Sequence, residues 1–105
     1  MRPMPLFVMI GSDGERGAER RQAVRPAHLA HWAALDAAGC VRFGGPLLDT
    51  EGRPVGSVLV FEAESLAAAR GQAERDPYVT GGIFGRFELH ETRAVLPGPP
   101  PAPQS

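Results

Sequence analysis

The stretch Leu6-Phe7-Val8-Met9-Ile10 decides the fold. Its five apolar, largely strand-forming residues follow one another without the alternation of a half-exposed strand, which is typical of a strand covered on both faces. We therefore place this strand in the centre of a sheet. The segment Gly11-Ser12-Asp13-Gly14 ends it, because glycine and small polar residues favour turns.

A helix follows this central strand. Residues 15–22 carry opposite charges at i,i+4 spacing and predict an irregular or short helical connection with a solvated charged face, which includes Arg16, Arg20 and Arg21. Pro26 suits the first turn of a helix, and apolar residues at helical spacing run from Leu29 to Leu35. The sequence therefore predicts a helix from about Pro26 to Gly39.

The second half of the chain predicts a hairpin, a helix and a last strand. Residues 40–48 and 55–61 form two strands around a Gly- and Pro-containing turn, and Gly44-Gly45 allows a bulge or a close approach of the backbone. Ser65 caps a helix that runs to Arg75, and Asp76-Pro77 stops it. Residues 83–91 alternate as a half-exposed strand.

The predicted order β-α-β-β-α-β is the ferredoxin-like arrangement, an α+β fold. Both helices lie on one face of a four-stranded antiparallel sheet in this arrangement. The uninterrupted apolar residues of the central strand need cover on the other face, which a second copy of the chain would supply. We expect a homodimer, one domain over residues 1–96 and a disordered proline-rich tail over residues 97–105.

Composition excludes several functional classes. With 105 residues the chain has room for one core, and its net charge of -1 leaves no basic surplus for binding nucleic acid. The longest apolar run is too short to cross a bilayer, so we expect no membrane partner and a cytoplasmic location. Cys40 is the one cysteine, which excludes an internal disulfide framework.

Histidines are the side chains best suited to proton transfer at neutral pH. His28 falls in the first turn of the predicted helix, where the helix dipole favours the neutral, proton-accepting imidazole. Asp76 is held by the following proline and suits the task of orienting an imidazole. Both have plainer interpretations, His28 as a capping or interface histidine and Asp76 as a helix stop. His31 has no third ligand at a recognisable spacing, so we expect no metal.

A pocket around His28 would draw on further residues. Arg25 is a candidate for binding an anionic group, Ser57 supplies a hydroxyl, and Gly45 lets the backbone come close to a ligand. The apolar walls are expected from four aromatic residues, Trp32, Phe43, Tyr78 and Phe84.

Several segments together resemble the YciI-like (YCII-related) family in order and spacing. They are Val24-Arg25-Pro26-Ala27-His28-Leu29-Ala30, Gly44-Gly45-Pro46-Leu47, Ser65-Leu66, Asp76-Pro77-Tyr78-Val79 and Gly82-Ile83-Phe84. The resemblance runs from about Leu6 to His90. It implies a dimeric α/β barrel of two ferredoxin-like subunits and a histidine–aspartate pair in a cleft, which carries over to His28 and Asp76. Some family members resemble lactone isomerases or dehydrochlorinases that act without a cofactor.

The leading hypothesis is a cofactor-free enzyme in which His28 is the general acid–base and Asp76 its orienting carboxylate. It would catalyse proton transfer or elimination on a small molecule, as an isomerase or a dehydrochlorinase-like lyase. The alternative is a non-catalytic module that binds a small ligand or another protein on the same fold.

Overall fold

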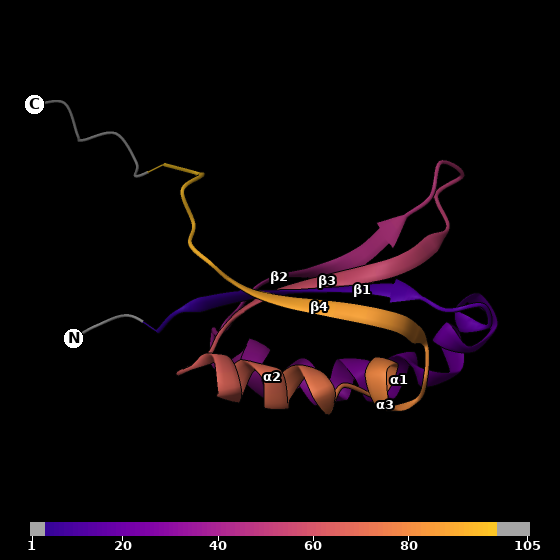
Figure 1. The fold of residues 1–105 in the computed structure, drawn as a ribbon, viewed down its shortest axis with the longest axis horizontal. Helices are drawn as coiled ribbons and strands as arrows, with labels where there is room; N and C mark the ends of the chain where they lie inside the picture. The colour runs from indigo at the N-terminus through magenta and orange to yellow at the C-terminus, as the bar shows by residue number, and fades with distance from the viewer. Residues whose placement is uncertain (1–3, 99–105) are drawn as a thin grey trace, which may run out of the picture.

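The computed structural model describes residues 4–98 and has an α+β, ferredoxin-like fold. Its elements are β1 (Leu6–Asp13), α1 (Gly17–Ala37), β2 (Val41–Leu48), β3 (Pro54–Glu62), α2 (Leu66–Glu74), α3 (Pro77–Thr80) and β4 (Phe84–Thr92). The helices lie on one face of the sheet (Figure 1). None of the helices in the described part of the chain is long and apolar enough to cross a membrane.

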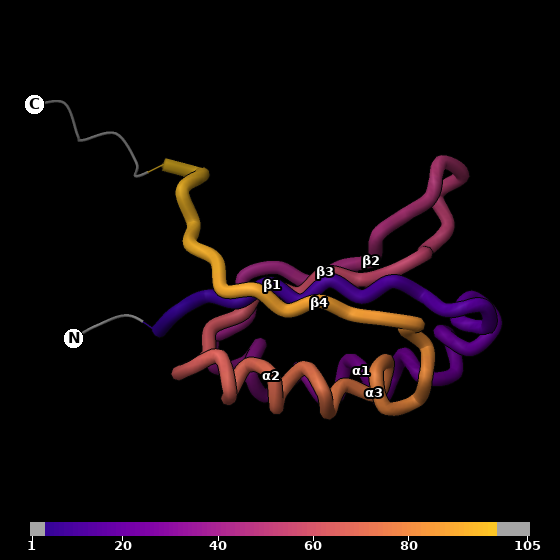
Figure 2. Tube along the Cα trace, viewed as in Figure 1, coloured from indigo at the N-terminus to yellow at the C-terminus, as the bar shows by residue number. Residues whose placement is uncertain are grey.

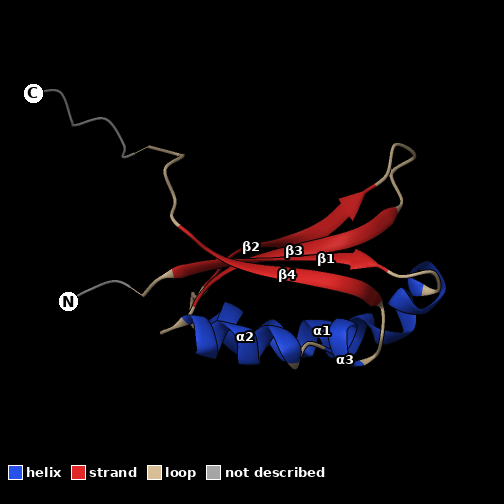
Figure 3. Cartoon of the chain, in the orientation of Figure 1, coloured by secondary structure: helices blue, strands red, loops and turns tan. Residues whose placement is uncertain are grey.

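The sheet has the strand order β2-β3-β1-β4, and all neighbouring strands are antiparallel. The central position predicted for the first strand is therefore confirmed, since β1 pairs with both β3 and β4. The β2–β3 hairpin extends away from the helical layer at one end of the sheet (Figure 3). The Cα trace shows the same hairpin turning away from β1 and β4 (Figure 2).

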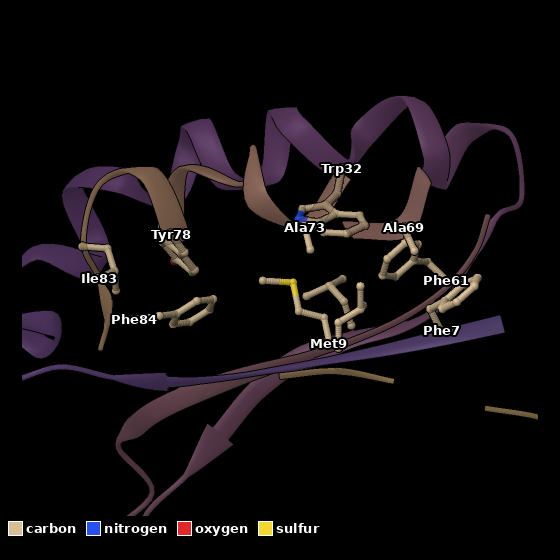
Figure 4. Close-up of a cluster of buried hydrophobic side chains, with 11 residues drawn as sticks. Phe7, Met9, Trp32, Phe61, Ala69, Ala73, Tyr78, Ile83 and Phe84 are labelled. Atoms are coloured by element: carbon tan, nitrogen blue, oxygen red, sulfur yellow. The ribbon is translucent and has the colours of Figure 1, made fainter. Parts of the chain in front are cut away.

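The core lies between the sheet and the helices. Phe7 and Met9 of β1 point into this layer, where the ring of Phe7 packs against Phe61 of β3 (Figure 4). Trp32 of α1 packs edge-on against Phe61, with 4.9 Å between the ring centroids. Ala69 and Ala73 are the fully buried residues of α2, and their small side chains let this helix lie close to the sheet.

The outer face of the sheet is apolar and only half-buried in the single chain. Val8 of β1 lies opposite Val60 of β3, and Ile10 lies opposite Val58. All four side chains have intermediate exposure. Within residues 4–98, no segment of the chain fully covers this second face.

Helix α1 begins earlier than the sequence predicts. The sequence places Pro26 in the first turn, whereas α1 begins at Gly17 and Pro26 lies inside it. Proline inside a helix removes one backbone hydrogen bond. The extra turns are held by tertiary contacts that no local pattern reveals, because Gly17 fits closely against Asp13 and the Ile83 carbonyl, and Val24 packs against the core.

The turn at Asp76-Pro77 also does more than end a helix. Ser65 caps α2 as predicted, by accepting a hydrogen bond from the amide of Ala68, and the helix ends before Asp76. The four-residue helix α3 then begins at Pro77, a position where the missing proline N–H costs nothing. The proline-rich tail expected over residues 97–105 lies, from residue 99 onward, outside the described residues.

We expect Gly56→Ala to destabilise the fold by about 1–3 kcal/mol, because it overpacks the centre of the sheet. A methyl group at this position would clash with the backbone carbonyl oxygen of Gly11, which has little freedom to move. Urea denaturation followed by circular dichroism measures the change. Gly45→Ala is the control, since its methyl group would meet only the Phe43 ring, at 3.5 Å. Equal free energies of unfolding for the two variants would contradict the prediction.

Candidate active site

The structure brings His28 and Asp76 together from elements 48 residues apart in the chain. Nδ1 of His28 lies 2.8 Å and 3.0 Å from the two carboxylate oxygens of Asp76. Asp76 is fully buried and His28 is 8% exposed. An ionised carboxylate only accepts hydrogen bonds, so Nδ1 carries the hydrogen and donates it. In the neutral imidazole, Nε2 then keeps its lone pair.

His28 occupies a different part of its helix from the one predicted. It lies in the middle of α1 rather than in the first turn, so the helix N-terminus does not act on it. The chemistry of His28 depends on Asp76 instead. The contact is made by Asp76, the residue that precedes α3.

Asp76 is held by two further donors. The indole Nε1 of Trp32 donates to one carboxylate oxygen at 2.9 Å, and the backbone amide of Tyr78 donates to the other at 2.9 Å. Burial acts to raise the pKa of Asp76, but the hydrogen bonds from His28, Trp32 and the Tyr78 amide outweigh it and leave the pKa below 3.8. The carboxylate is therefore ionised at neutral pH and fixed in direction.

The aromatic ring of Tyr78 packs against the imidazole of His28. Its ring is stacked on His28 at 3.9 Å between centroids and 8° between planes. Phe84 packs edge-on against the same tyrosine, at 5.6 Å. Burial raises the pKa of the Tyr78 hydroxyl, and the nearby guanidinium groups of Arg21 and Arg25 oppose that shift only in part. The hydroxyl therefore keeps its proton at neutral pH.

His28 opens into a cleft of about 780 Å³ between α1 and the β2–β3 hairpin. Five of the predicted pocket residues line it with His28: Arg25, Trp32, Gly45, Ser57 and Tyr78. The walls also include three charged side chains that were not predicted to line it, Arg21, Asp36 and Arg53. Of the three arginines in the lining, Arg21 is paired with Asp13, and Arg53 is paired with Asp49 and Glu51.

Two predicted pocket residues are elsewhere. Phe43 is 58% exposed and lies opposite Val60 on the outer face, because a register shift follows Val41 in β2. Phe84 lies in the core, where its ring covers Gly11. Neither aromatic ring lines the cleft. Asp76 does not line it either, and acts on the cleft only through His28.

Arg21 is the site residue that the sequence analysis missed. Its side chain is 12% exposed, not solvated, and its Nε donates to Asp13 at 2.7 Å. Its Nη2 donates to the Gly56 carbonyl at 2.7 Å and to the Ser57 hydroxyl at 2.6 Å. The available signal was the seven-residue spacing from Arg21 to His28, two turns on one helix face. That signal is lost when the helix is started at Pro26.

The remaining histidines lie outside this arrangement. Nε2 of His31 is 2.8 Å from the Gln72 carbonyl, which accounts for its place between α1 and α2. His90 is exposed on β4, beside Glu88. Over residues 4–98 no three His, Cys, Asp or Glu side chains gather as metal ligands would.

The fold and the cleft define a ferredoxin-like domain with a buried histidine–aspartate pair behind an open pocket. The chain belongs to the family of the YCII-related domain, whose model matches residues 5–93. It is 35% identical to Protein YciI of Escherichia coli O6:H1 over 97 residues, which cover 87% of this chain and 99% of the relative. The Protein YciI of Shigella flexneri matches equally well.

Solved structures share the fold of this chain. A 5-chloro-2-hydroxyhydroquinone dehydrochlorinase from Burkholderia phenoliruptrix AC1100, in complex with 2,5-dihydroxybenzoquinone, superimposes with a TM-score of 0.77. It is 28% identical, and the match covers 84% of this chain and 93% of that one. An antibiotic biosynthesis monooxygenase-like protein from Nitrosomonas europaea shares the fold, with a TM-score of 0.55 at 12% identity over 92% of this chain and 96% of that chain.

The buried carboxylate predicts a specific pH dependence of stability. Asp76→Asn should lower the free energy of unfolding at neutral pH by about 1–3 kcal/mol, because it removes the charge that three donors satisfy. The folded-state pKa of Asp76 lies below 3.8, so its contribution is present above that value and is lost as the pH falls through the folded-state pKa. The difference between the two proteins should therefore shrink on acidification.

Urea denaturation at a series of pH values from neutral to acidic measures this difference. Glu91→Gln, which changes an exposed carboxylate on β4, is the control and should match the wild type throughout. A gap between wild type and Asp76→Asn that stays constant with falling pH would contradict the assignment.

Proposed function

We propose that this protein is an enzyme that transfers a proton with His28 and needs no cofactor to do so. The observation that carries the proposal is the hydrogen bond between Nδ1 of His28 and the buried carboxylate of Asp76. It fixes the tautomer and leaves Nε2 as the basic nitrogen next to the cleft. Asp76 is the positioning residue, and its charge stabilises the imidazolium that forms when Nε2 takes a proton.

The reaction proposed is abstraction of a proton followed by isomerisation or elimination. Nε2 takes a proton from an acidic O–H or C–H group, and the electron pair of that bond moves into the conjugated system of the substrate. In an isomerisation, the imidazolium returns the proton to another atom. In an elimination, a neighbouring carbon–halogen bond breaks, halide leaves with the bonding pair, and the imidazolium later gives its proton to water. In the elimination, the substrate therefore loses one molecule of hydrogen halide.

The substrate class follows from the walls of the cleft. Trp32, Leu59 and Tyr78 supply apolar surface, and the arginines favour negative charge. A small, planar, acidic molecule fits both properties. The solved relative that carries 2,5-dihydroxybenzoquinone supports this class, since a hydroxyquinone is flat, acidic and conjugated. We therefore propose elimination or isomerisation on a hydroxylated ring or a comparable lactone.

The second candidate function is a binding module that uses the same cleft without turnover. A partly apolar cleft with arginines in its lining is suited to holding a small polar ligand whether or not chemistry follows. The two candidates differ in what they require of Nε2. Catalysis needs this nitrogen to be basic and in contact with the ligand, whereas binding alone does not.

Substitution of His28 separates the two functions. His28→Gln should lower kcat for release of chloride from 5-chloro-2-hydroxyhydroquinone by about 10²–10⁴-fold, because the base is removed. Its affinity for 2,5-dihydroxybenzoquinone should stay within about twofold, since most of the cleft is unchanged. His31→Gln, on the same helix and outside the cleft, is the control and should keep full activity. Tight binding without turnover in the wild type would favour the module.

We also propose that the protein is a homodimer joined through the outer face of the sheet. Val8, Ile10, Val58 and Val60 form a half-buried apolar surface there, and the exposed ring of Phe43 lies beside Val60 at its edge. Apolar surface of this extent on one side of a sheet is unusual for a monomer. A second copy, related by twofold symmetry, would cover it without any additional partner.

Sedimentation velocity at micromolar concentration tests the assembly. We expect the wild type to sediment as a dimer and Val8→Glu to shift toward monomer, because the variant places a charge in the centre of the apolar face. Leu66→Glu changes an exposed leucine on the helical side and should remain dimeric. A wild-type protein that is monomeric and fully folded would refute the proposal.

A further inference from the structure

The cleft is longer than a ligand bound at His28 alone would need. The residues of α1 that line it run from Ala18 to Asp36, which corresponds to about 27 Å along the helix axis. A dihydroxybenzoquinone is a single six-membered ring, about 7 Å across. A ring held against Nε2 of His28 therefore fills only part of the cleft, whose volume is about 780 Å³.

We call the part of the cleft at the C-terminal end of α1 the distal compartment. Trp32 packs on Phe61, which is the Cα partner of Val41 in β2. The Cys40 amide donates to the Leu35 carbonyl at 2.9 Å, so the chain turns from α1 directly into β2 and the two walls converge at this end. The residues that line the distal compartment are Trp32, Ala33 and Asp36 of α1, Val41 and Gly44 of β2, and Leu59 of β3.

The distal compartment has space because both of its walls carry a small residue. Ala33 is exposed on α1, and Gly44 lies in β2 opposite Leu59. A Cβ atom at Gly44 would lie 2.9 Å from Cδ1 of Leu59, so a larger residue there would narrow the cleft. Trp32, Val41 and Leu59 make the rest of the surface apolar. A surface of this kind favours an alkyl group, which loses contact with water when it binds.

Asp36 adds a negative charge to this apolar compartment. It is the one acidic residue among the described residues that line the cleft, and none of the ion pairs within the described residues includes it. It lies in the last turn of α1, a helix described over its whole length, and no basic residue lies in that turn. The carbonyl groups at a helix C-terminus carry partial negative charge, so an acidic residue is unfavourable there. A cationic ligand therefore accounts for Asp36 better than the stability of α1 does.

We propose that the distal compartment binds an apolar arm of the substrate that ends in an ammonium group beside Asp36. This inference rests on the proposed function, in which the reacting ring lies against Nε2 of His28, and it narrows the substrate class. His28 and Asp36 are eight residues apart, about 12 Å along the helix axis. Beyond the ring, this distance leaves room for an arm of about four to six atoms. The substrate is then a hydroxylated ring with a cationic alkyl side chain, and Asp36 determines specificity for that side chain.

Three quinones test the distal compartment by isothermal titration calorimetry. The parent probe is 2,5-dihydroxybenzoquinone, and the two armed probes carry either a 5,5-dimethylhexyl or a 4-(trimethylammonio)butyl group at position 3. The two arms have the same shape and differ in one atom, a neutral carbon or a positively charged nitrogen. In the wild type, we expect the neutral armed probe to bind about tenfold or more tightly than the parent, because the compartment buries its alkyl arm.

Two substitutions separate the apolar arm from its charge. Ala33→Phe fills the compartment and should weaken both armed probes by about tenfold or more relative to the parent. Asp36→Asn should shift the ratio of the two armed Kd values by about three- to fivefold against the cation, because an exposed ion pair contributes only modestly.

Each substitution has a matched control. Ala34→Phe places the same ring on an exposed neighbouring position of α1 outside the cleft, and should leave the three affinities unchanged. Glu74→Gln removes an exposed carboxylate from the last turn of α2, and should keep the wild-type ratio of the armed probes. The inference is overturned by equal affinities of the parent and the neutral armed probe in the wild type, by equal effects of the two phenylalanine variants, or by an unchanged ratio in Asp36→Asn.

The distal compartment and the proposed function fail in different ways. His28→Gln should abolish turnover of 5-chloro-2-hydroxyhydroquinone and keep the gain in affinity that the arms provide. If His28→Gln retains turnover, the proposed function is wrong whatever the armed probes show. If it abolishes turnover while the arms bring no gain in the wild type, proton transfer by His28 stands and the distal compartment is wrong. If none of the three probes binds the wild type, both proposals are wrong.

Discussion

The candidate site depends on the carboxylate of Asp76. It accepts hydrogen bonds from an imidazole and an indole of α1 and from the backbone amide that starts α3. A buried carboxylate is stable only when its oxygens are satisfied, so these donors must all be present in the folded chain. One side chain thereby joins α1 to the α2–α3 turn and sets the direction of the His28 ring. The core and the site are built around the same group, since Trp32 also packs on Phe61.

One face of α1 supplies two of the polar side chains that line the cleft. Arg21 and His28 lie two turns apart on α1, and both pack against the ring of Tyr78. The β2–β3 hairpin closes the opposite wall and brings Ser57 to the guanidinium. Under the proposed function, His28 on this helix face is the base that contacts the ligand in the cleft.

Most of the fold is determined locally and was predicted from the sequence. The apolar run from Leu6 to Ile10 marks the central strand, Ser65 marks the start of α2, and the order of the elements gives the ferredoxin-like arrangement. These signals work because strand formers, caps and turn residues act within a few positions of the chain. The family resemblance, which the match over residues 5–93 confirms, pointed further to His28 and Asp76.

The sequence by itself determined which segments form strands and helices, and it indicated two candidate site residues. The tertiary structure decided which of these segments and side chains come into contact. Pro26 predicted a helix start that tertiary contacts of Gly17 and Val24 override. A register shift in β2 turns Phe43 away from the cleft, and burial of the charged Arg21 turns an expected solvated residue toward it. Contacts of this kind join positions dozens of residues apart, where neither periodicity nor propensity acts.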